Sequence, residues 1–330
     1  MLVGAAAIAR TALGVALLVA AAPALGAAVA GGTPPPSTGP FEAELAAAVN
    51  HLEARHGRPE AIAPLVELLS LEDELPPGRI EPGLLRRAAA ASADPLVAAQ
   101  ATFDLARLLD QGGAAAGARA ARASLGLFSR YVVVGPFGEG RSDFAQAFPP
   151  EAEAAAPERA RSYQGKRGGD IGWRDGDELV RDGALLLDGL LRPDTQATAY
   201  VVVFARTPRD RDVALRFGAP GPLKIWVNGA LVHARDVVHG AGFDQDAAPA
   251  RLRAGWNRVV VKTTVTDEPW RLYLRVTDPA GRPLDVGDGA LPAGPVVVAR
   301  APARGAKAAK IATLEAALRR RALAAPPGPA

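Results

Sequence analysis

The sequence feature that most constrains this chain is the stretch PLKIWVNGALV, residues 222–232. Its first half alternates apolar with other residues, which is the period of a strand with one buried face. The apolar positions are Leu223, Ile225 and Val227. Asn228 and Gly229 then separate two apolar runs, and both tolerate the positive φ that a type I′ turn needs at its two central positions. The stretch therefore predicts a tight hairpin whose second arm runs over 230–234.

A second phrase of this kind, RAGWNRVVVKTTV, occupies residues 253–265. A turn at Ala254-Gly255 leads there into a β-branched run, Val259–Val265. A strand that ends in Trp-x-Asn-Gly, followed by Gly-x-Asn before a hydrophobic strand, resembles the jelly-roll sandwich of galactose-binding-like domains. Sugar-binding domains attached to many glycosidases belong to that group. The resemblance covers residues 129–284 and implies an antiparallel β-sandwich with a sugar-binding role.

Two further phrases, RYVVVGPFG at 130–138 and YQGK at 163–166, add to this likeness. They resemble the sandwich of large exported bacterial proteins that carry tetratricopeptide repeats and a transglutaminase-like domain. Short runs with a period of two predict strands over the whole region, with Gly, Pro and Asp clusters between them. These runs are 131–134, 171–174, 184–187, 199–205, 213–217, 223–227, 231–234, 258–266 and 270–277. The pattern indicates an antiparallel sandwich or barrel.

The residues from Phe41 onward have the apolar period of helices instead. We expect helices at 41–56, 59–71, 81–91 and 94–111, and a linker or a weak last helix at 112–124. Asp94 before Pro95 is typical of an N-cap with proline at the first helical position. Paired short helices resemble a tetratricopeptide-type module, which would bind a protein partner. A small bundle packed on the sandwich is the alternative, because no repeat meets the period of about 34 residues.

The two ends of the chain have their own composition. Arg10, an apolar run and Ala28-Val29-Ala30 follow the layout of a signal peptide with an A-x-A cleavage site. An uncleaved membrane anchor is the alternative, since the apolar stretch approaches the roughly 20 residues that span a bilayer. Residues 307–324 have the pattern of a basic helix. Its arginines either face solvent or contact an acidic lipid or polymer.

Together these patterns predict an α+β multidomain protein, in which an all-α helical module precedes an antiparallel jelly-roll-like β-sandwich. We expect a signal peptide or anchor at 1–30, a linker at 31–40, the helical module at 41–126, the sandwich at 127–288, a linker at 289–304 and a basic helical tail at 305–330. We also expect a periplasmic or secreted protein, which touches a membrane only through an uncleaved amino-terminal segment.

Composition excludes several functions. The sequence has no cysteine, which rules out disulfides, thiolate metal sites and a cysteine nucleophile. Its net charge is +3, and the basic excess lies in residues 286–330, with 7 basic against 2 acidic residues. Residues 129–285 are balanced, with 22 against 21. A nucleic-acid-binding domain concentrates positive charge on its folded face, so we expect no nucleic-acid partner.

Catalytic motifs are not found in the sequence. There is no H-E-x-x-H, no G-x-S-x-G and no phosphate-binding G-x-x-x-x-G-K-[ST]. His51 and His56 do not have the spacing that places two ligands on one helical face. His233 ends the second arm of the hairpin and His239 lies in the loop after it, where the two are ordinary exposed residues or a metal pair. The carboxylates of WRDGDE at 173–178 and GFDQD at 242–246 suit turns or, alternatively, a calcium ion. We expect no cofactor, no metal and no enzyme activity.

Aromatic residues give the best indication of a site. Sugar rings stack on tryptophan or tyrosine, and their hydroxyl and acidic groups take amides and arginine. Trp226 shares a strand face with Lys224, and Tyr273 shares one with two arginines. If both faces meet on one sheet, the ligand contacts are Trp226 and Tyr273 for stacking, with Asn228, Arg271 and Arg275 for polar groups. The alternative is that these aromatic residues only pack the sandwich.

Two functions follow from these observations. The first is a non-catalytic exported protein that binds a glycan or envelope polymer or takes part in assembly. The second is an accessory amino-terminal region of a larger envelope enzyme, transglutaminase-like or glycosidase-associated, whose catalytic domain is not in this chain.

Overall fold

The computed structural model of the chain describes residues 40–55, 61, 65, 68, 80–153, 157–286 and 310–313. Within this part, the chain divides into two units between Ala118 and Arg119. The predicted signal peptide and second linker lie outside the described residues, as do most of the first linker and of the tail. The described chain is α+β, and all its strand pairs are antiparallel.

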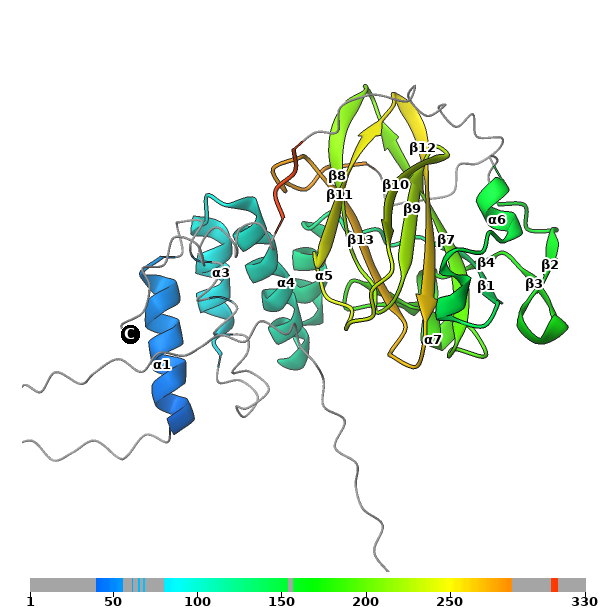
Figure 1. Ribbon diagram of the computed structural model, residues 1–330. Coiled ribbons are helices and arrows are strands. Elements are labelled where there is room, and N and C mark those ends of the chain that lie inside the picture. The colour runs from blue at the N-terminus through cyan, green and yellow to red at the C-terminus, as the bar shows by residue number, and fades with distance from the viewer. Residues whose placement is uncertain are drawn as a thin grey trace, which may run out of the picture. The chain divides into compact units, whose positions relative to one another are not determined.

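Helices make up the regular structure of the first unit. They are α1 (Pro40–Glu53), α3 (Pro82–Ala91), α4 (Pro95–Gln111) and α5 (Ala115–Ala123), the last of which crosses the division (Figure 1). The Asp94 carboxylate accepts hydrogen bonds from the backbone N–H groups of Leu96 at 2.8 Å and Val97 at 3.5 Å, so the predicted N-cap is confirmed. Of the two alternatives for 112–124, the helix is found. The predicted second helix lies almost wholly outside the described residues, and the tetratricopeptide-like arrangement stays a prediction.

None of the helices in the described ranges is long and apolar enough to cross a membrane.

Two sheets form the second unit. The six-stranded sheet has the order β10-β9-β12-β7-β1-β4, and the five-stranded sheet has the order β11-β8-β13-β6-β5. The strands of the six-stranded sheet are β1 (Val132–Phe137), β4 (Arg174–Asp175), β7 (Ala197–Thr207), β9 (Leu223–Val227), β10 (Ala230–Arg235) and β12 (Gly255–Val265). Those of the five-stranded sheet are β5 (Val180–Arg181), β6 (Ala184–Leu186), β8 (Arg211–Gly218), β11 (Asp246–Leu252) and β13 (Arg271–Thr277). A small hairpin, β2 (Ser162–Gln164) with β3 (Asp170–Gly172), forms a separate two-stranded sheet.

The inner faces of the two sheets form one core because alternation places their apolar residues on the same side. Val201 of β7, Val261 of β12 and Leu274 of β13 belong to this cluster, as does Trp270 before β13. The longest pairing, β7 with β12, runs from Gly255 opposite Thr207 to Val265 opposite Ala197. The strand β7 is buried on both faces, apart from Arg206. At β7, the six-stranded sheet is therefore covered on its outer side as well.

The central hairpin forms as predicted. Asn228 has φ 51° and Gly229 has φ 83°, the positive values that the turn between β9 and β10 requires. Trp226 pairs with Leu231 across the hairpin, and the register shifts before His233, so that Val232 is an extra residue. This bulge keeps Leu231 on the outer face while His233 points inward, opposite Ile225.

Three sequence-based expectations need correction. The strand β11 was missed because Pro249 and the GFDQD segment indicate a loop; β11 is an edge strand, where a residue without an N–H is tolerated. The predicted strand 171–174 is divided at Trp173 between β3 and β4. Residues 310–313 are not helical, because the backbone of Ala312 instead bonds to Pro279 and to the Arg216 side chain.

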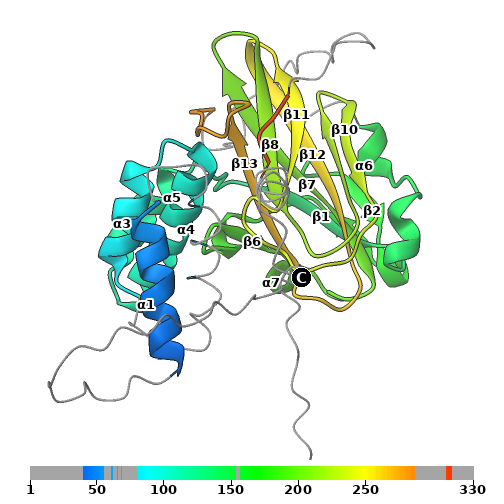
Figure 2. The ribbon, with the colours of Figure 1, turned by 60° about the vertical axis from the view of Figure 1, so that its left-hand side comes forward.

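Short helical turns complete the sandwich. They are η3 (Arg141–Phe144), α6 (Pro149–Ala152), η4 (Lys166–Gly168), η5 (Asp177–Leu179) and α7 (Leu187–Leu190). Figures 1 and 2 both show α6 and β2 beside the six-stranded sheet, on the side away from β8 and β13. We call residues 138–153, which contain η3 and α6, the strap.

Candidate binding face

The residues predicted to bind a ligand lie on two different sheets. Trp226 is on β9 of the six-stranded sheet, and Arg271, Tyr273 and Arg275 are on β13 of the five-stranded sheet. Both sets point outward, because their neighbours in sequence belong to the core between the sheets. The outer faces of a sandwich point in opposite directions. The predicted single surface that would combine Trp226 with Tyr273 therefore does not exist.

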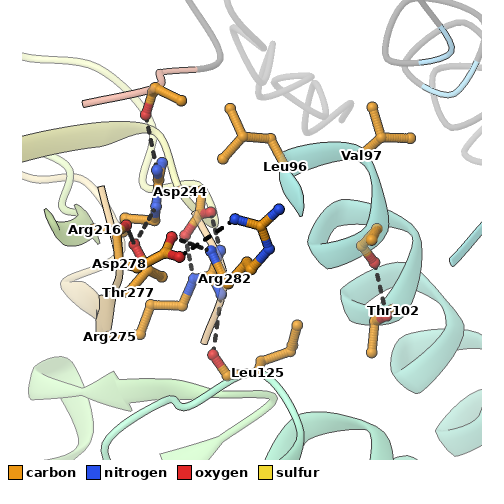
Figure 3. Close-up of polar contacts among 12 residues, drawn as sticks. Leu96, Val97, Thr102, Leu125, Arg216, Asp244, Arg275, Thr277, Asp278 and Arg282 are labelled. Carbon is orange, nitrogen blue, oxygen red and sulfur yellow. Dashed lines mark hydrogen bonds and ion pairs between the residues drawn. The ribbon is translucent and has the colours of Figure 1, made fainter. Parts of the chain in front are cut away.

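Arg275 is also not available to a ligand. It is 1% exposed, and its Nε donates to Asp244 Oδ1 at 2.7 Å while its Nη2 donates to Asp244 Oδ2 (Figure 3). Its Nη1 donates to the Leu125 carbonyl at 3.0 Å, and the Phe243 ring centre lies 4.9 Å from the guanidinium carbon. This arginine has a structural role, whereas Arg271 is exposed and Tyr273 is half-buried on the same strand.

Another part of that outer face is covered by segments from elsewhere in the chain. Arg216 of β8, also 1% exposed, donates from Nε to the Thr277 hydroxyl at 3.0 Å and from Nη2 to the Ala312 carbonyl at 2.8 Å (Figure 3). The backbone N–H of Leu284 donates to the Val276 carbonyl at 3.3 Å. Segments far apart in sequence thus accept hydrogen bonds from the buried arginines of this face.

Asn228 is occupied within the sandwich. Its Nδ2 donates to Asn257 Oδ1 at 2.8 Å, and its Oδ1 accepts from the Arg258 backbone N–H at 2.9 Å. Asn257 in turn donates to the Arg253 carbonyl at 2.8 Å. The amide therefore ties the hairpin turn to the start of β12, which is a structural role that its position in the turn motif did not indicate.

The outer face of the six-stranded sheet carries a second apolar cluster, which we call the aromatic face. Its buried members are Val132, Val134, Phe137, Tyr163, Trp173, Tyr200, Val202, Phe204 and Val260. Phe148 of the strap packs on it, with its ring centre 5.0 Å from that of Phe137. Trp226 and Trp256 are partly buried at its margin. The strap and the β2–β3 hairpin therefore cover this face, but not completely.

One buried ion pair holds the strap on the sheet. The Lys262 side chain is 1% exposed, and its Nζ lies 3.0 Å from Glu151 Oε1 and donates to the Gln146 carbonyl. Tyr200 donates its hydroxyl proton to the same Glu151 oxygen at 2.6 Å. Burial lowers the pKa of Lys262, although the Glu151 carboxylate opposes this shift. Burial and the bond to Glu151 raise the pKa of Tyr200 above its ordinary value.

A second polar group lies at the end of the strap. Tyr163 donates to Glu153 Oε1 at 2.7 Å, and Trp173 Nε1 donates to the Tyr163 hydroxyl at 2.8 Å. Burial, followed by the bond to Glu153, raises the pKa of Tyr163 to about 12. Arg258 of β12 donates from Nη1 to the Glu153 backbone carbonyl. Burial lowers the pKa of Arg258, and the Glu153 charge opposes that shift.

Arg258 and Lys262 were missed as functional candidates, although the period of two contained a signal. In NRVVVKTTV they alternate with core valines, so they must point to the same outer face as Trp256. The register then places that face beside Trp226, because Val260 pairs with Trp226. Sequence reasoning had treated this strand only as an apolar run.

The margin of the aromatic face around Trp226 includes exposed side chains. Leu231, directly across the hairpin, is 55% exposed. The Lys224 ammonium lies 4.7 Å from the centre of the Phe144 ring, and the Arg206 guanidinium lies 5.8 Å from the centre of the Trp256 ring. Apolar and aromatic surface therefore occurs next to cations, an arrangement that suits a ligand with both an apolar face and acidic or hydroxyl groups.

The aspartates considered for calcium have cation or backbone partners. Asp175 pairs with Arg159, and Asp246 pairs with Arg235. The Asp177 side chain accepts the Tyr131 backbone N–H at 2.9 Å. Among the residues that the structure describes, no group of three or more acidic or histidine side chains is placed to hold a metal ion.

The two histidines after the turn lie at one edge of the sandwich. His233 packs its ring against Phe217, with ring centres 4.7 Å apart, and burial lowers the pKa of His233. His239 Nε2 lies 3.9 Å from Asp246 Oδ2. Both line a cavity of about 10 Å³, which is the size needed for one water molecule. This cavity is too small for a sugar.

Comparisons with known proteins give no family. No family model matches the chain, and no curated protein matches it. An anti-sigma factor domain-containing protein from Clostridium clariflavum matches at 13% identity and a TM-score of 0.26, over 32% of this chain and 36% of that one. The chain thus spans about a third of the length of that protein.

Two further solved structures match parts of the chain. A family 35 carbohydrate binding module from an environmental isolate matches at 18% identity and a TM-score of 0.21, over 29% of this chain and 70% of that one. The PA14 domain of an antifreeze protein matches at 12% identity and a TM-score of 0.27, over 46% and 82%. Scores this low carry no argument about fold or ligand, so the assignments below rest on the chain's own strands and side chains.

Proposed function

We propose that the sandwich is a non-catalytic module that binds a glycan at the margin of the aromatic face. We call this margin the Trp226 surface and define it by Lys224, Trp226, Leu231 and Trp256. The observation that carries the proposal is the partial burial of Trp226 on the outer face of a sheet, beside a leucine that is 55% exposed. Within the described residues, the strap and the β2–β3 hairpin cover much of the rest of the same face, whereas Trp226 and Leu231 stay accessible.

The chemistry of this surface suits a sugar. The C–H face of a pyranose is apolar and packs on an indole ring, while Lys224 and Arg206 supply donors for oxygen atoms close by. A flat aromatic anchor with few torsions to fix loses little conformational entropy on binding. The resemblance of the Trp-x-Asn-Gly phrase to galactose-binding-like domains supports the same class of ligand.

The partners of the acidic residues favour binding over catalysis. General acid and base chemistry on a sugar needs two carboxylates free to face the glycosidic bond. The carboxylates that the sequence offered are engaged instead, Asp175 with Arg159 and Asp244 with Arg275. We place this module on an exported protein because of the signal-peptide layout, and amino-terminal sequencing of envelope fractions should then read a start near Gly31.

A glycan array with three proteins tests the proposal: wild type, Trp226→Ala and Tyr273→Ala. Tyr273 is the matched control, since it is a half-buried aromatic on the opposite sheet. We expect Trp226→Ala to weaken binding by about 10-fold or more, which corresponds to about 1.4 kcal/mol, and Tyr273→Ala to keep it. Because Trp226 is partly buried, its removal should cost about 1 to 2 kcal/mol of stability. A wild-type protein that binds no glycan, or equal binding by all three, contradicts the proposal.

A further inference from the structure

Three turns lie together at one end of the sandwich, and a buried amide ties two of them. Asn257 is 0% exposed, and its Oδ1 accepts from Asn228 Nδ2 and from the Arg253 backbone N–H, both at 2.8 Å. This residue therefore joins the β9–β10 turn to the β11–β12 turn. The Ala254 backbone N–H donates to Asp210 Oδ1 at 2.9 Å, which brings the β7–β8 turn to the same end.

Two of these turns carry an excess of arginine. Residues 206–212 and 251–256 contain five arginines and two aspartates. Without these seven residues, the region 129–285 has 17 basic and 19 acidic residues, so the excess is local. Asp285 approaches the same end, because the carbonyl of its neighbour Val286 accepts the Arg206 backbone N–H at 2.7 Å, and it lowers the excess charge to two. We call the five side chains the arginine end: Arg206, Arg209, Arg211, Arg251 and Arg253.

The two aspartates of these turns are occupied by two of the arginines. Arg251 Nη1 donates to Asp212 Oδ1 at 3.0 Å, and Arg253 Nη1 donates to Asp210 Oδ2. The hydrogen bonds from the Ala254 backbone and from Arg253 lower the pKa of Asp210. Within the described residues, the members of the arginine end that pair with no carboxylate are Arg206, Arg209 and Arg211. The first two are exposed and the third is half-buried, so their charge is open to solvent.

Arg206 connects the arginine end to the Trp226 surface. It lies directly opposite Trp256 in the pairing of β7 with β12, and its guanidinium is 5.8 Å from the centre of the indole. It follows Phe204 of the aromatic face by two residues, so it points to the same outer side. Trp256 belongs to the Trp226 surface and is itself only half-buried. A ligand packed on that surface therefore has exposed arginine next to it.

We propose that the arginine end binds the carboxylate or sulfate groups of an acidic glycan whose sugar rings pack on the Trp226 surface. The proposal rests on the glycan-binding function above and names the class of its ligand. Arginine keeps its charge at every physiological pH, and its planar fork fits the oxygen atoms of such anions. A nucleic acid or an anionic membrane contacts positive charge spread over a wide face, whereas here the charge is confined to one end beside an indole.

The first test changes the ligand and keeps the wild-type full chain. Oligogalacturonates are compared with their methyl esters, and sulfated galactans with the neutral galactans. At about 0.15 M salt, where the Debye length is about 8 Å, attraction between distant charges is largely screened. We expect the charged form of at least one of the two pairs to bind about 10-fold or more tightly than its uncharged counterpart, because only that form pairs with the exposed arginines.

The outcomes of this test separate the inference from the function beneath it. Equal binding of charged and uncharged forms in both pairs overturns the acidic class but leaves glycan binding intact, whereas no binding of any glycan overturns the function itself. A DNA duplex or phosphatidylglycerol vesicles, added at the same concentration of charge, should not displace the acidic glycan. Displacement by either one overturns the assignment to a glycan.

The second test removes the two exposed arginines together. We expect Arg206→Gln with Arg209→Gln to lower the preference for charged over uncharged glycan by about 10-fold, while the uncharged forms bind as before. The matched control is Arg181→Gln with Arg271→Gln, which removes the same charge from exposed positions on the five-stranded sheet. An unchanged preference in the first double variant overturns the proposal. An equal loss in both also overturns it, because net charge rather than this end would then decide binding.

Both double variants should fold, since all four side chains are exposed. Near-ultraviolet circular dichroism checks this. If the first double variant is not folded, Arg209→Gln alone replaces it, because Arg209 lies in the turn and no described side chain pairs with it. We then expect the preference to fall by about 3-fold, and an unchanged preference overturns the proposal.

Discussion

The two outer faces of the sandwich are built from similar strands, but other segments of the chain cover them to different extents. On the five-stranded sheet, Arg216 and Arg275 are 1% exposed, and segments from distant parts of the unit accept hydrogen bonds from both side chains. On the six-stranded sheet, the strap covers the β1 and β7 side, while Trp226 and Leu231 at the β9–β10 side stay partly or largely exposed. A cation next to aromatic residues is therefore accessible only where the chain itself does not cover it.

The two faces also differ in how well the charge of a buried arginine is compensated. A buried guanidinium is tolerated when its desolvation is offset by a carboxylate and further hydrogen bonds. Arg275 has both, through Asp244 and Leu125. Arg258 has the carbonyl of Glu153 but no carboxylate from the described chain. Both arginines are therefore buried parts of the scaffold, and Arg275 is the better compensated of the two.

The largest loss of stability is expected when the buried ion pair on the outer face of the five-stranded sheet is removed. Asp244→Asn should leave the Arg275 charge buried without its counterion and lower stability by about 3 to 5 kcal/mol. Tryptophan fluorescence during urea unfolding of the full chain measures this loss, because all four tryptophans lie in the second unit. Asp246→Asn is the control, since its partner Arg235 is 43% exposed and such pairs contribute about 1 kcal/mol or less. Equal losses in both variants would mean that the five-stranded face is not held by its buried pair.

An intermediate effect is expected where the strap meets the six-stranded sheet. Lys262→Met removes the cation beside Glu151 and the donor to the Gln146 carbonyl, so it should cost about 1 to 3 kcal/mol. Loosening of the strap should also speed trypsin cleavage after Arg141, which is exposed in η3.

Lys224→Met is the matched control for this experiment. It removes a lysine of the same face whose contact is the Phe144 ring, which is worth about 0.5 to 1 kcal/mol at such sites. If both variants lose equal stability and neither changes the rate of cleavage, Lys262 does not hold the strap.

The smallest effect is expected at the edge that joins the two sheets, where His233 of β10 packs on Phe217 of β8. Burial lowers the pKa of His233 below its ordinary value of 6.5; Asp246 opposes this shift and Arg235 adds to it. The pKa of His233 is thus lower in the folded protein than in the unfolded chain, and between these two values the unfolded chain binds the proton more readily. The stability of the fold should therefore decrease as the pH falls below about 6.5.

Urea unfolding at pH 7.5 and pH 5.5 tests this direction. His233→Gln should show a smaller loss at pH 5.5 than the wild type. His51→Gln on α1, in the other unit, should lose as much stability in the sandwich as the wild type does. A wild-type sandwich that gains stability on acidification would refute the assigned direction of the shift.

Local patterns in the sequence determined several features of this protein. The Asn228-Gly229 turn, the N-cap at Asp94 and the inward side of most strands follow from positive φ, from side-chain capping and from the period of two. Each of these depends on residues that are close together in the chain. For the same reason the sequence placed Trp226 on the outward side of its strand, and the structure agrees.

The sheet to which each strand belongs was decided only by the tertiary structure. Strand pairing joins residues far apart in sequence. The alternation of apolar and polar residues indicates which side of its strand a residue faces, but not to which sheet the strand belongs. Trp226 and Tyr273 therefore came to lie on opposite faces, although each was placed correctly within its own strand. The partners of the arginines depend on the same distant contacts. Asp244 lies 31 residues before Arg275 in the chain, whereas Glu153, which anchors Arg258, is 105 residues away and offers it only a carbonyl oxygen.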